Sequence, residues 1–208
     1  MRLLNTTKLH LEEIANCNVT QYAILSHRWR DGEVTLDDLH EDHRRAAETK
    51  AGFQKINISC KQEVHDGFDH IWVDTCCIDK SSSSELSEAI NSMYRWYENA
   101  EVCYAYLFDV PDGTDPFTDA VGMFANSQWF TRGWTLQEFI APKRVVFFSQ
   151  SWVELGTRLN LRHTLSKITG IDQRVLDGTR DLRSVSIAKR ISWAAKEKLQ
   201  DQKMRRTV

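Results

Sequence analysis

Four short apolar runs, separated by segments with helical periodicity, constrain the fold of this chain most strongly. They are YAILS at 22–26, HIWVD at 70–74, VCYAYL at 102–107 and RVVFFS at 144–149. Continuous apolar runs of this length are typical of strands that are buried on both faces of a parallel sheet. Strands that alternate with helices predict an open parallel α/β sheet, and the handedness of the crossovers places helices on both of its faces.

Two of the segments between these runs have clear helical signals. The first begins at Thr35–Asp38, which has a Thr-x-x-Asp helix start, and its longer continuation closes at Asp66-Gly67. In the second, Ser82 and Glu85 resemble a capping box. Helical spacing predicts one core face made of Phe53, Ile56, Cys60 and Val64, and another made of Leu86, Ala89, Ile90, Met93 and Tyr97.

From Ser151 onward the pattern changes to helices. One carries Leu161, Leu165 and Ile168 on a single stripe with Gly170 as its C-cap, and a last helix after Ser184 bears Ile187, Ile191 and Ala195. We therefore expect one domain over 1–208, with an α/β core at about 1–150 and a helical C-terminal part at about 151–208. The charged tail LQDQKMRRTV has no cap signal, which also fits a piece of a longer protein.

Composition argues against several classes of protein. The formal charge is only −2 and the basic residues are dispersed, so no nucleic-acid or membrane-surface footprint is expected. No apolar run approaches the roughly 20 residues that span a bilayer. The N-terminal MRLLNTTKLHLEEI has acidic residues where a signal peptide has its apolar region, so we expect a cytoplasmic protein.

The cysteines and histidines offer weaker signals. An odd number of cysteines without a CxxC pair fits reduced thiols: Cys17, Cys60, Cys76, Cys77 and Cys103. The adjacent pair at 76–77 is either a redox pair or, as we favour, buried structure at a strand end. His40 and His43 have acidic neighbours, but a solvated helix face explains them better than a metal site, and we expect no metal.

The segment before the fourth run carries an unusually placed carboxylate. Trp134 and Glu138 are four residues apart, so on a helix they share one face. Pro142 cannot continue that helix, which places Glu138 in the last turn, where the helix dipole disfavours a negative charge. Two interpretations stay open: a ring over a carboxylate in a ligand site, or a solvated Glu whose charge Lys143 and Arg144 offset.

Polar residues gather where the expected strands end. Ser26–Trp29 follows the first run, Asp74–Asp79 the second and Asp109 the third. Ligands of open α/β sheets bind outside the carboxyl ends of the strands, and Glu138 lies in the crossover that returns over this edge. Each of these residues also has a bland explanation, such as packing at a strand end or the ordering of a loop by Asp side chains.

The chain resembles the fungal heterokaryon-incompatibility (HET) domain. The resemblance rests on YAILSHRW at 22–29, GEVTLDDL at 32–39, HIWVDTCCIDKSSSSELSEAINSMYRWY at 70–97 and WFTRGWTLQEFIAP at 129–142, and it extends into RSVSIAKRISWAA. The charged segment after Ala195 departs from the family pattern. The combination of motifs is more specific than any one of them.

The HET family is in turn similar to TIR domains, flavodoxin-like modules of which many cleave NAD. Ser26–Arg28 corresponds to the polar end of their first strand, ELSEAINS at 85–92 to the helix after their second strand, and WTLQEF at 134–139 to their Trp-Cys-Leu-x-Glu-Leu box. That box carries the TIR catalytic glutamate. The resemblance therefore implies a flavodoxin-like fold and Glu138 as the catalytic residue, with Thr135 in place of the Cys.

The chemistry of NAD cleavage is compatible with one carboxylate. Nicotinamide leaves a cationic ring as a neutral group, so no acid is needed, and a carboxylate can hold the ribose and stabilise oxocarbenium-like charge. Trp134 could stack on a ring, and basic side chains with the helix start after SSSS could meet the pyrophosphate. The strand-end positions, the resemblance and this chemistry together lead us to expect a substrate-binding set of Ser26, His27, Arg28, Trp29, Asp74, Asp79, Arg132 and Trp134.

The sequence thus predicts an NAD glycohydrolase that acts as a cell death effector in fungal incompatibility or innate immunity, with NAD as substrate and no bound cofactor. A homo-oligomer on activation and an upstream signalling domain or protein are the expected partners. The alternative is a non-catalytic, self-associating signalling module. A redox or metal-dependent enzyme that uses Cys76 and Cys77 is a third, weaker hypothesis.

Overall fold

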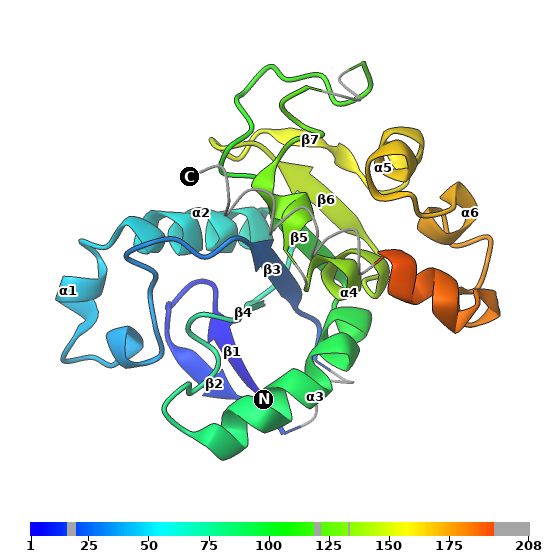
Figure 1. The fold of residues 1–208 in the computed structure, drawn as a ribbon. Coiled ribbons are helices and arrows are strands. Elements are labelled where there is room, and N and C mark those ends of the chain that lie inside the picture. The colour runs from blue at the N-terminus through cyan, green and yellow to red at the C-terminus, as the bar shows by residue number, and fades with distance from the viewer. Residues whose placement is uncertain (16–19, 119–121, 133, 194–208) are drawn as a thin grey trace. The chain divides into compact units, whose positions relative to one another are not determined.

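The computed structural model describes residues 1–15, 20–118, 122–132 and 134–193, and the statements below concern these residues (Figure 1). They fall into two compact units. Unit 1 comprises Met1–Tyr104 with Ala141–Lys143, and unit 2 comprises Ala105–Ile140 with the chain from Arg144 onward. The expected single domain over 1–208 stays a prediction.

The fold is α/β, as predicted, with an open seven-stranded sheet of order β2-β1-β4-β3-β5-β6-β7. Strand β5 contributes residues to both units. The strands are β1 Arg2–Asn5, β2 Leu11–Glu13, β3 Ala23–His27, β4 His70–Val73, β5 Val102–Tyr106, β6 Val145–Phe148 and β7 Glu154–Thr157. All four apolar runs of the sequence therefore form strands, with boundaries close to those expected.

Not every strand runs parallel, which corrects the expectation of a purely parallel sheet. Strands β3 and β4 are parallel, with Ala23 opposite Ile71. Strand β1 is antiparallel to β4, and β2 is antiparallel to β1, because the short link between β1 and β2 permits only a hairpin. The sequence allows a short strand or an extended arm at Arg2–Leu4 followed by irregular structure. The structure has a strand there and a second one at β2, so the segment extends the sheet, and Leu3 and Leu4 are fully buried in it.

The helices of unit 1 are η1 Asp37–Leu39, α1 Arg44–Ala47, α2 Ala51–Asp66 and α3 Ser83–Asn99. The Ser82 hydroxyl caps α3 by accepting the backbone N–H of Glu85 at 3.3 Å, and Gly67 closes α2 in the left-handed conformation. Since β4 and β5 flank β3 on opposite sides, right-handed crossovers place α2 and α3 on opposite faces of the sheet (Figure 1).

The core face of α2 is more polar than the predicted stripe. Ile56 and Cys60 are buried as expected, but Val64 is exposed, and Lys55 and Glu63 are buried in its place. On α3, Ala89 and Tyr97 are buried as expected, whereas Ile90 is 42% exposed, so the predicted face there is wrong at that position. Polar contacts therefore take part in fixing α2 against the sheet.

Glu63 is the clearest of these contacts. One of its carboxyl oxygens accepts the backbone N–H of Ala23, the first residue of β3, at 2.8 Å. The other oxygen has no hydrogen-bond partner among the residues described. Burial raises the pKa of this carboxyl well above 4.5, so Glu63 is held as a neutral acid.

Unit 2 packs around a cluster of edge-to-face aromatic rings centred on Phe147 of β6, with Phe124, Trp129 and Phe139 around it. Its helices are η2 Gln128–Thr131, α4 Thr135–Ile140, α5 Arg162–Thr169, α6 Gln173–Leu176 and η3 Leu182–Ser184, followed by helical residues at 187–193.

The sequence predicted only helices from Ser151 onward. The structure also has a strand there, β7, which pairs antiparallel with β6. Gly170 caps α5 in the left-handed conformation, as expected. In the last helix, Ile187 and Ile191 are 67% and 62% exposed, and Trp193 is the buried side chain. Ala195, which the sequence also placed in this helix, lies outside the described residues.

The four cysteines that the structure describes are buried free thiols, at positions 60, 76, 77 and 103, and Cys17 lies outside the described residues. Burial raises the pKa of the Cys60 thiol, and a hydrogen bond with Cys77 together with burial raises that of Cys76. The raised pKa values disfavour the reactive thiolate form of Cys60 and Cys76, as expected for structural cysteines. Among the described helices, none is long and apolar enough to cross a membrane.

The neutral state of Glu63 predicts a pH-dependent stability. The unfolded chain releases this proton above about pH 4.5 and the folded chain retains it, so stability falls as pH rises from that value through the raised pKa. Glu63→Gln, which cannot ionise, should remove about 1–3 kcal/mol of this loss between about pH 5 and pH 8. Urea unfolding across that range measures the free energy of unfolding at each pH. The exposed Glu98→Gln is the matched control. If the free energy of unfolding changes equally with pH in both variants, Glu63 is not the group responsible.

Candidate functional site

The residues that the sequence singled out lie in two groups, one in each unit. Unit 1 holds Ser26, His27, Arg28, Trp29, Asp74 and Asp79, and unit 2 holds Arg132, Trp134 and Glu138.

In unit 1, Trp29 and Asp74 meet beyond the ends of the parallel strands β3 and β4. The indole N–H of Trp29 donates to Asp74 Oδ2 at 2.7 Å. The Lys80 ammonium lies 3.7 Å from the centroid of the Trp29 ring, a cation-π contact. Trp29 is itself half exposed, so one side chain links a carboxylate, a cation and solvent. Sequence reasoning missed Lys80, which lies in the polar loop before SSSS.

His27, the last residue of β3, is buried beside the same carboxylate. Its Nε2 lies 3.3 Å from Asp74 Oδ1, but neither ring nitrogen has a well-aligned hydrogen bond within the described structure. Burial lowers the pKa of the imidazole, and the Lys55 ammonium lowers it further, while Asp74 acts in the opposite direction. His27 is therefore neutral at neutral pH. Lys55 is in turn neutralised by Glu33, with oxygens 2.6 and 2.7 Å from its Nζ.

Asp79 orders the loop before α3. Its carboxylate accepts both the backbone N–H of Ser81 at 2.9 Å and the Ser81 hydroxyl at 2.6 Å. These hydrogen bonds lower the pKa of Asp79, and its own N–H donates to Glu85 at 2.8 Å. This arrangement matches the loop-ordering alternative for Asp79.

In unit 2, Glu138 of α4 accepts two parallel hydrogen bonds from the Arg132 guanidinium, at 2.8 and 3.0 Å. Glu138 is only 2% exposed. Two parallel hydrogen bonds of this kind fix the orientation of the carboxylate and place a positive charge beside it. From the sequence, Lys143 and Arg144 are the candidates to offset the charge of Glu138; in the structure, Lys143 pairs with Glu101 at 3.1 Å.

Helix α4 has only six residues, so Glu138 lies in its first turn as well as near its end. The unfavourable interaction with the helix dipole that the sequence predicted for Glu138 therefore does not apply to so short a helix. Thr135, which replaces the Cys of the resembling motif, is buried and donates its hydroxyl to the Trp129 carbonyl at 2.8 Å, anchoring the start of the helix.

Trp134 immediately precedes α4 and differs from Glu138 in its surroundings. The Glu138 N–H donates to the Trp134 carbonyl at 3.4 Å, so the two residues are one turn apart, as predicted. The Trp134 side chain, however, is 50% exposed, whereas the Glu138 carboxylate is buried against Arg132. The ring is thus available to solvent and the carboxylate is not.

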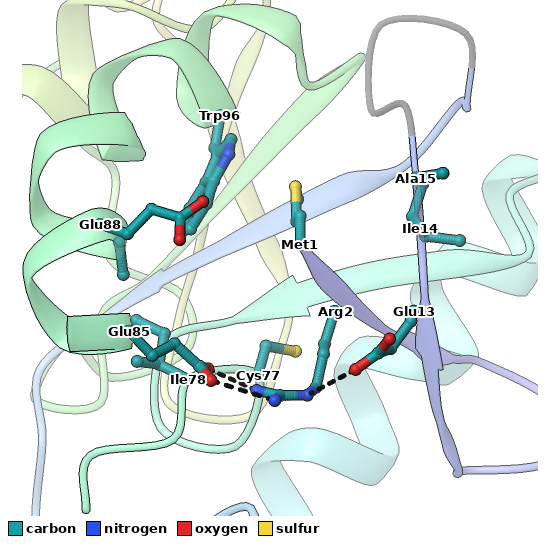
Figure 2. Close-up of a pocket in the computed structure, with 11 residues that line it drawn as sticks. Met1, Arg2, Glu13, Ile14, Ala15, Cys77, Ile78, Glu85, Glu88 and Trp96 are labelled. Atoms are coloured by element: carbon teal, nitrogen blue, oxygen red, sulfur yellow. Dashed lines mark hydrogen bonds and ion pairs between the residues drawn. The ribbon is translucent and has the colours of Figure 1, made fainter. Parts of the chain in front are cut away.

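A cavity of about 450 Å³ in unit 1 lies outside all of these predictions (Figure 2). The β1–β2 hairpin contributes Arg2 and Glu13 to its walls, and α3 contributes Glu85, Glu88 and Trp96. Helical spacing indicates that the three α3 residues share a face. The cavity could not be found from sequence because the hairpin was not predicted. No group of three or more metal-ligating side chains occurs among the residues placed by the structure.

Residues 22–121 match the family model described as "Heterokaryon incompatibility protein (HET)". The chain is 44% identical over 190 residues to "Vegetative incompatibility protein HET-E-1" from Podospora anserina, an alignment that covers 88% of this chain and 14% of that protein. No solved structure matches the chain.

The Arg132–Glu138 pair predicts a specific pattern of stability. Arg132→Met leaves a buried carboxylate without its partner and should lower the free energy of unfolding by about 3–5 kcal/mol. Adding Glu138→Gln to that variant should recover most of the loss, because the uncompensated charge is gone. Chemical denaturation of the two single variants and the double variant measures the coupling.

Lys143→Met is the matched control for this cycle. It breaks the exposed pair with Glu101 and should cost less than about 1 kcal/mol. Strictly additive losses at Arg132 and Glu138 would show that the two side chains do not interact.

Proposed function

Because residues 22–121 match the heterokaryon incompatibility (HET) family and the chain is 44% identical to a vegetative incompatibility protein, we propose that it acts as a programmed cell death effector in fungal vegetative incompatibility or innate immunity, and that it does so by hydrolysing NAD. The matched relative is named for vegetative incompatibility, and this chain spans only 14% of its length. An upstream signalling part, supplied by the rest of such a protein or by a partner, and self-assembly on activation belong to the same proposal.

The observation that carries the proposal is the buried carboxylate of Glu138 in a fixed orientation. Electrostatic stabilisation of a transition state works best from groups that are pre-oriented and shielded from water. Arg132 donates to both oxygens of Glu138, so the buried carboxylate has a cationic partner at hydrogen-bond distance. A catalytic carboxylate would need both properties.

In the proposed reaction, the bond between the ribose C1′ and the nicotinamide nitrogen breaks and its electron pair leaves with nicotinamide. Water adds to C1′, which gives ADP-ribose and a proton. The role of Glu138 is to stabilise the oxocarbenium-like charge and to hold the ribose hydroxyls. The half-exposed ring of Trp134 offers a stacking surface.

The unit 1 group supports substrate binding through its own chemistry. The Trp29 ring already carries a cation on its face, so it suits a pyridinium ring, and Asp74 provides a neighbouring negative charge. His27 is a buried neutral imidazole with free hydrogen-bonding capacity in the described structure. Arg28 lies in the same strand end, where a basic side chain can meet a phosphate. No resident cofactor or metal is part of the proposal, in which NAD is the substrate.

A second candidate function is a non-catalytic module that signals through self-association. Exposed apolar side chains on α3 favour it, because Ile90 and Tyr94 are 42% and 41% exposed and four residues apart on one face. In this alternative the Arg132–Glu138 pair has a purely structural role.

The catalytic proposal predicts release of nicotinamide from NAD by purified protein at high concentration, where assembly is favoured. Glu138→Gln should lower the rate about 10²–10³-fold, because the developing positive charge loses its stabilising carboxylate. The measurement is nicotinamide formation by chromatography, with thermal unfolding recorded in parallel to confirm that the variant is folded.

Glu154→Gln, an exposed carboxylate of β7, is the control in the same unit and should retain full activity. Equal turnover by wild type and Glu138→Gln, or no turnover under any assembly condition, would reject the catalytic proposal.

Cell death in a fungal host separates the two candidates. If NAD hydrolysis is the signal, Glu138→Gln should abolish death while the exposed-face variant Ile90→Ser leaves NAD turnover unchanged. If self-association alone is the signal, Ile90→Ser combined with Tyr94→Ser should abolish death and Glu138→Gln should retain it. Cellular NAD measured alongside viability distinguishes the outcomes.

A further inference from the structure

Arg158, a residue that the sequence did not single out, contacts the helix that carries Glu138. Its Nη1 donates to the carbonyl of Phe139 at 2.7 Å and to that of Ile140 at 3.2 Å. These are the last two residues of α4, and Arg158 directly follows β7, so donor and acceptors belong to unit 2. The last carbonyls of a helix have no intrahelical partner, and an arginine side chain is a suitable donor for them. Arg158 therefore closes the C-terminal end of α4.

Helix α4 depends on such contacts because it has only six residues. Isolated helices shorter than about 12 residues are at best marginally stable in water, so tertiary contacts decide whether and where this one forms. At its start, the Thr135 hydroxyl donates to the Trp129 carbonyl at 2.8 Å. On its buried face, the Phe139 ring lies 6.2 Å from the Phe147 ring, centroid to centroid. Arg158 holds the opposite end of the helix.

The turn that carries Arg158 is itself fixed to the sheet. The Arg158 N–H donates to the Val145 carbonyl at 2.9 Å, which continues the pairing of β6 with β7. The Thr157 N–H donates to Asn160 Oδ1 at 2.6 Å, and the Asn160 N–H donates back to the Thr157 hydroxyl at 3.2 Å. Gly156, with φ +140°, packs so closely that a Cβ there would lie 3.0 Å from Asn160 Oδ1. The backbone at Arg158 is thus well defined, and the guanidinium ties α4 to it.

Glu138 immediately precedes the two carbonyls that Arg158 binds. Its own partner, Arg132, lies before α4 and not on it, so the two parallel hydrogen bonds join α4 to the preceding segment. Bonds of this geometry require a fixed relative orientation of guanidinium and carboxylate. Opening of the last turn of α4 would move Glu138 relative to Arg132. A side chain that keeps this turn closed therefore also keeps the carboxylate in its orientation.

We propose that Arg158 is a positioning residue for Glu138: by binding the Phe139 and Ile140 carbonyls, it holds the carboxylate in the orientation that the proposed reaction requires. The catalytic consequence rests on the proposed function, whereas the positioning itself does not. Arg158 acts through the backbone of α4. Its loss leaves carbonyl groups without a donor, in contrast to the loss of Arg132, which leaves a buried charge, so the fold should tolerate substitution at Arg158 better.

Amide hydrogen exchange of the full chain tests the positioning without NAD. In Arg158→Met, the amides of residues 138–140 should exchange about tenfold faster than in wild type, because the last turn of α4 opens more often. The amides of β6 in the same sample report the unfolding of unit 2 as a whole and serve as the reference. Arg162→Met is the matched control, since Arg162 also donates to a backbone carbonyl, that of Leu159 at 3.0 Å, outside α4. It should change the exchange at 138–140 less than about twofold.

Steady-state kinetics of NAD hydrolysis test the catalytic consequence. Arg158→Met should lower kcat about tenfold or more and change KM less than about twofold, because a misoriented carboxylate loses transition-state stabilisation and not substrate binding. Arg158→Lys should recover part of the loss, since an ammonium can donate to the same carbonyls. A purely structural role would instead lower the melting temperature and leave the kcat of the folded protein unchanged.

The inference is overturned if the amides of residues 138–140 exchange no faster in Arg158→Met than in Arg162→Met, or if Arg158→Met hydrolyses NAD as fast as an active wild type. If Arg158→Met does not fold, Arg158→Lys carries both measurements, with a smaller effect in the same direction. An inactive wild type rejects the proposed function, and hydrogen exchange then decides by itself whether Arg158 positions Glu138. The two failures are therefore distinguishable.

Discussion

The parallel pair of β3 and β4 is the constraint on which unit 1 depends. Every residue of β3 is buried, as are three of the four in β4, so the pair must be covered on both faces. The helices α2 and α3 meet that need from opposite sides, and each makes a polar contact with β3. Glu63 of α2 accepts the Ala23 N–H, and the Tyr97 hydroxyl of α3 lies 3.5 Å from the Leu25 carbonyl. The strand ends that carry Trp29 and Asp74 are positioned by this packing.

Buried charge is arranged differently in the two units. Glu63 is buried without a cationic partner and becomes neutral, whereas Glu138 keeps a guanidinium bound to both of its oxygens. Burial makes an unpaired charge costly, so a carboxyl group must either be protonated or paired. The second solution is the one that a catalytic carboxylate requires, and this contrast makes Glu138 the better candidate.

The strands could be predicted from the sequence because YAILS, HIWVD, VCYAYL and RVVFFS are continuous apolar runs. The β1–β2 hairpin and β7 could not, because they are short and mix polar with apolar residues, and their pairing depends on neighbours distant in sequence. At the site, the motif identified Glu138 and Arg132 separately. Their direct pairing depends on the path of the chain between η2 and α4, which spacing alone does not define. The burial of Lys55 and Glu63 was missed because periodicity counts apolar residues only.

The outer strands of the sheet restrict how copies of this protein could assemble. Strand β2 has three residues, two of them glutamates, and β7 has four, beginning with an exposed Glu154. Short edge strands with charged side chains are poor templates for adding another strand. Repulsion between like carboxylates would oppose growth of the sheet across chain boundaries. Any ordered assembly of this domain should therefore be built through its helical surfaces, and its dissociation should not require the breaking of a shared β-ladder.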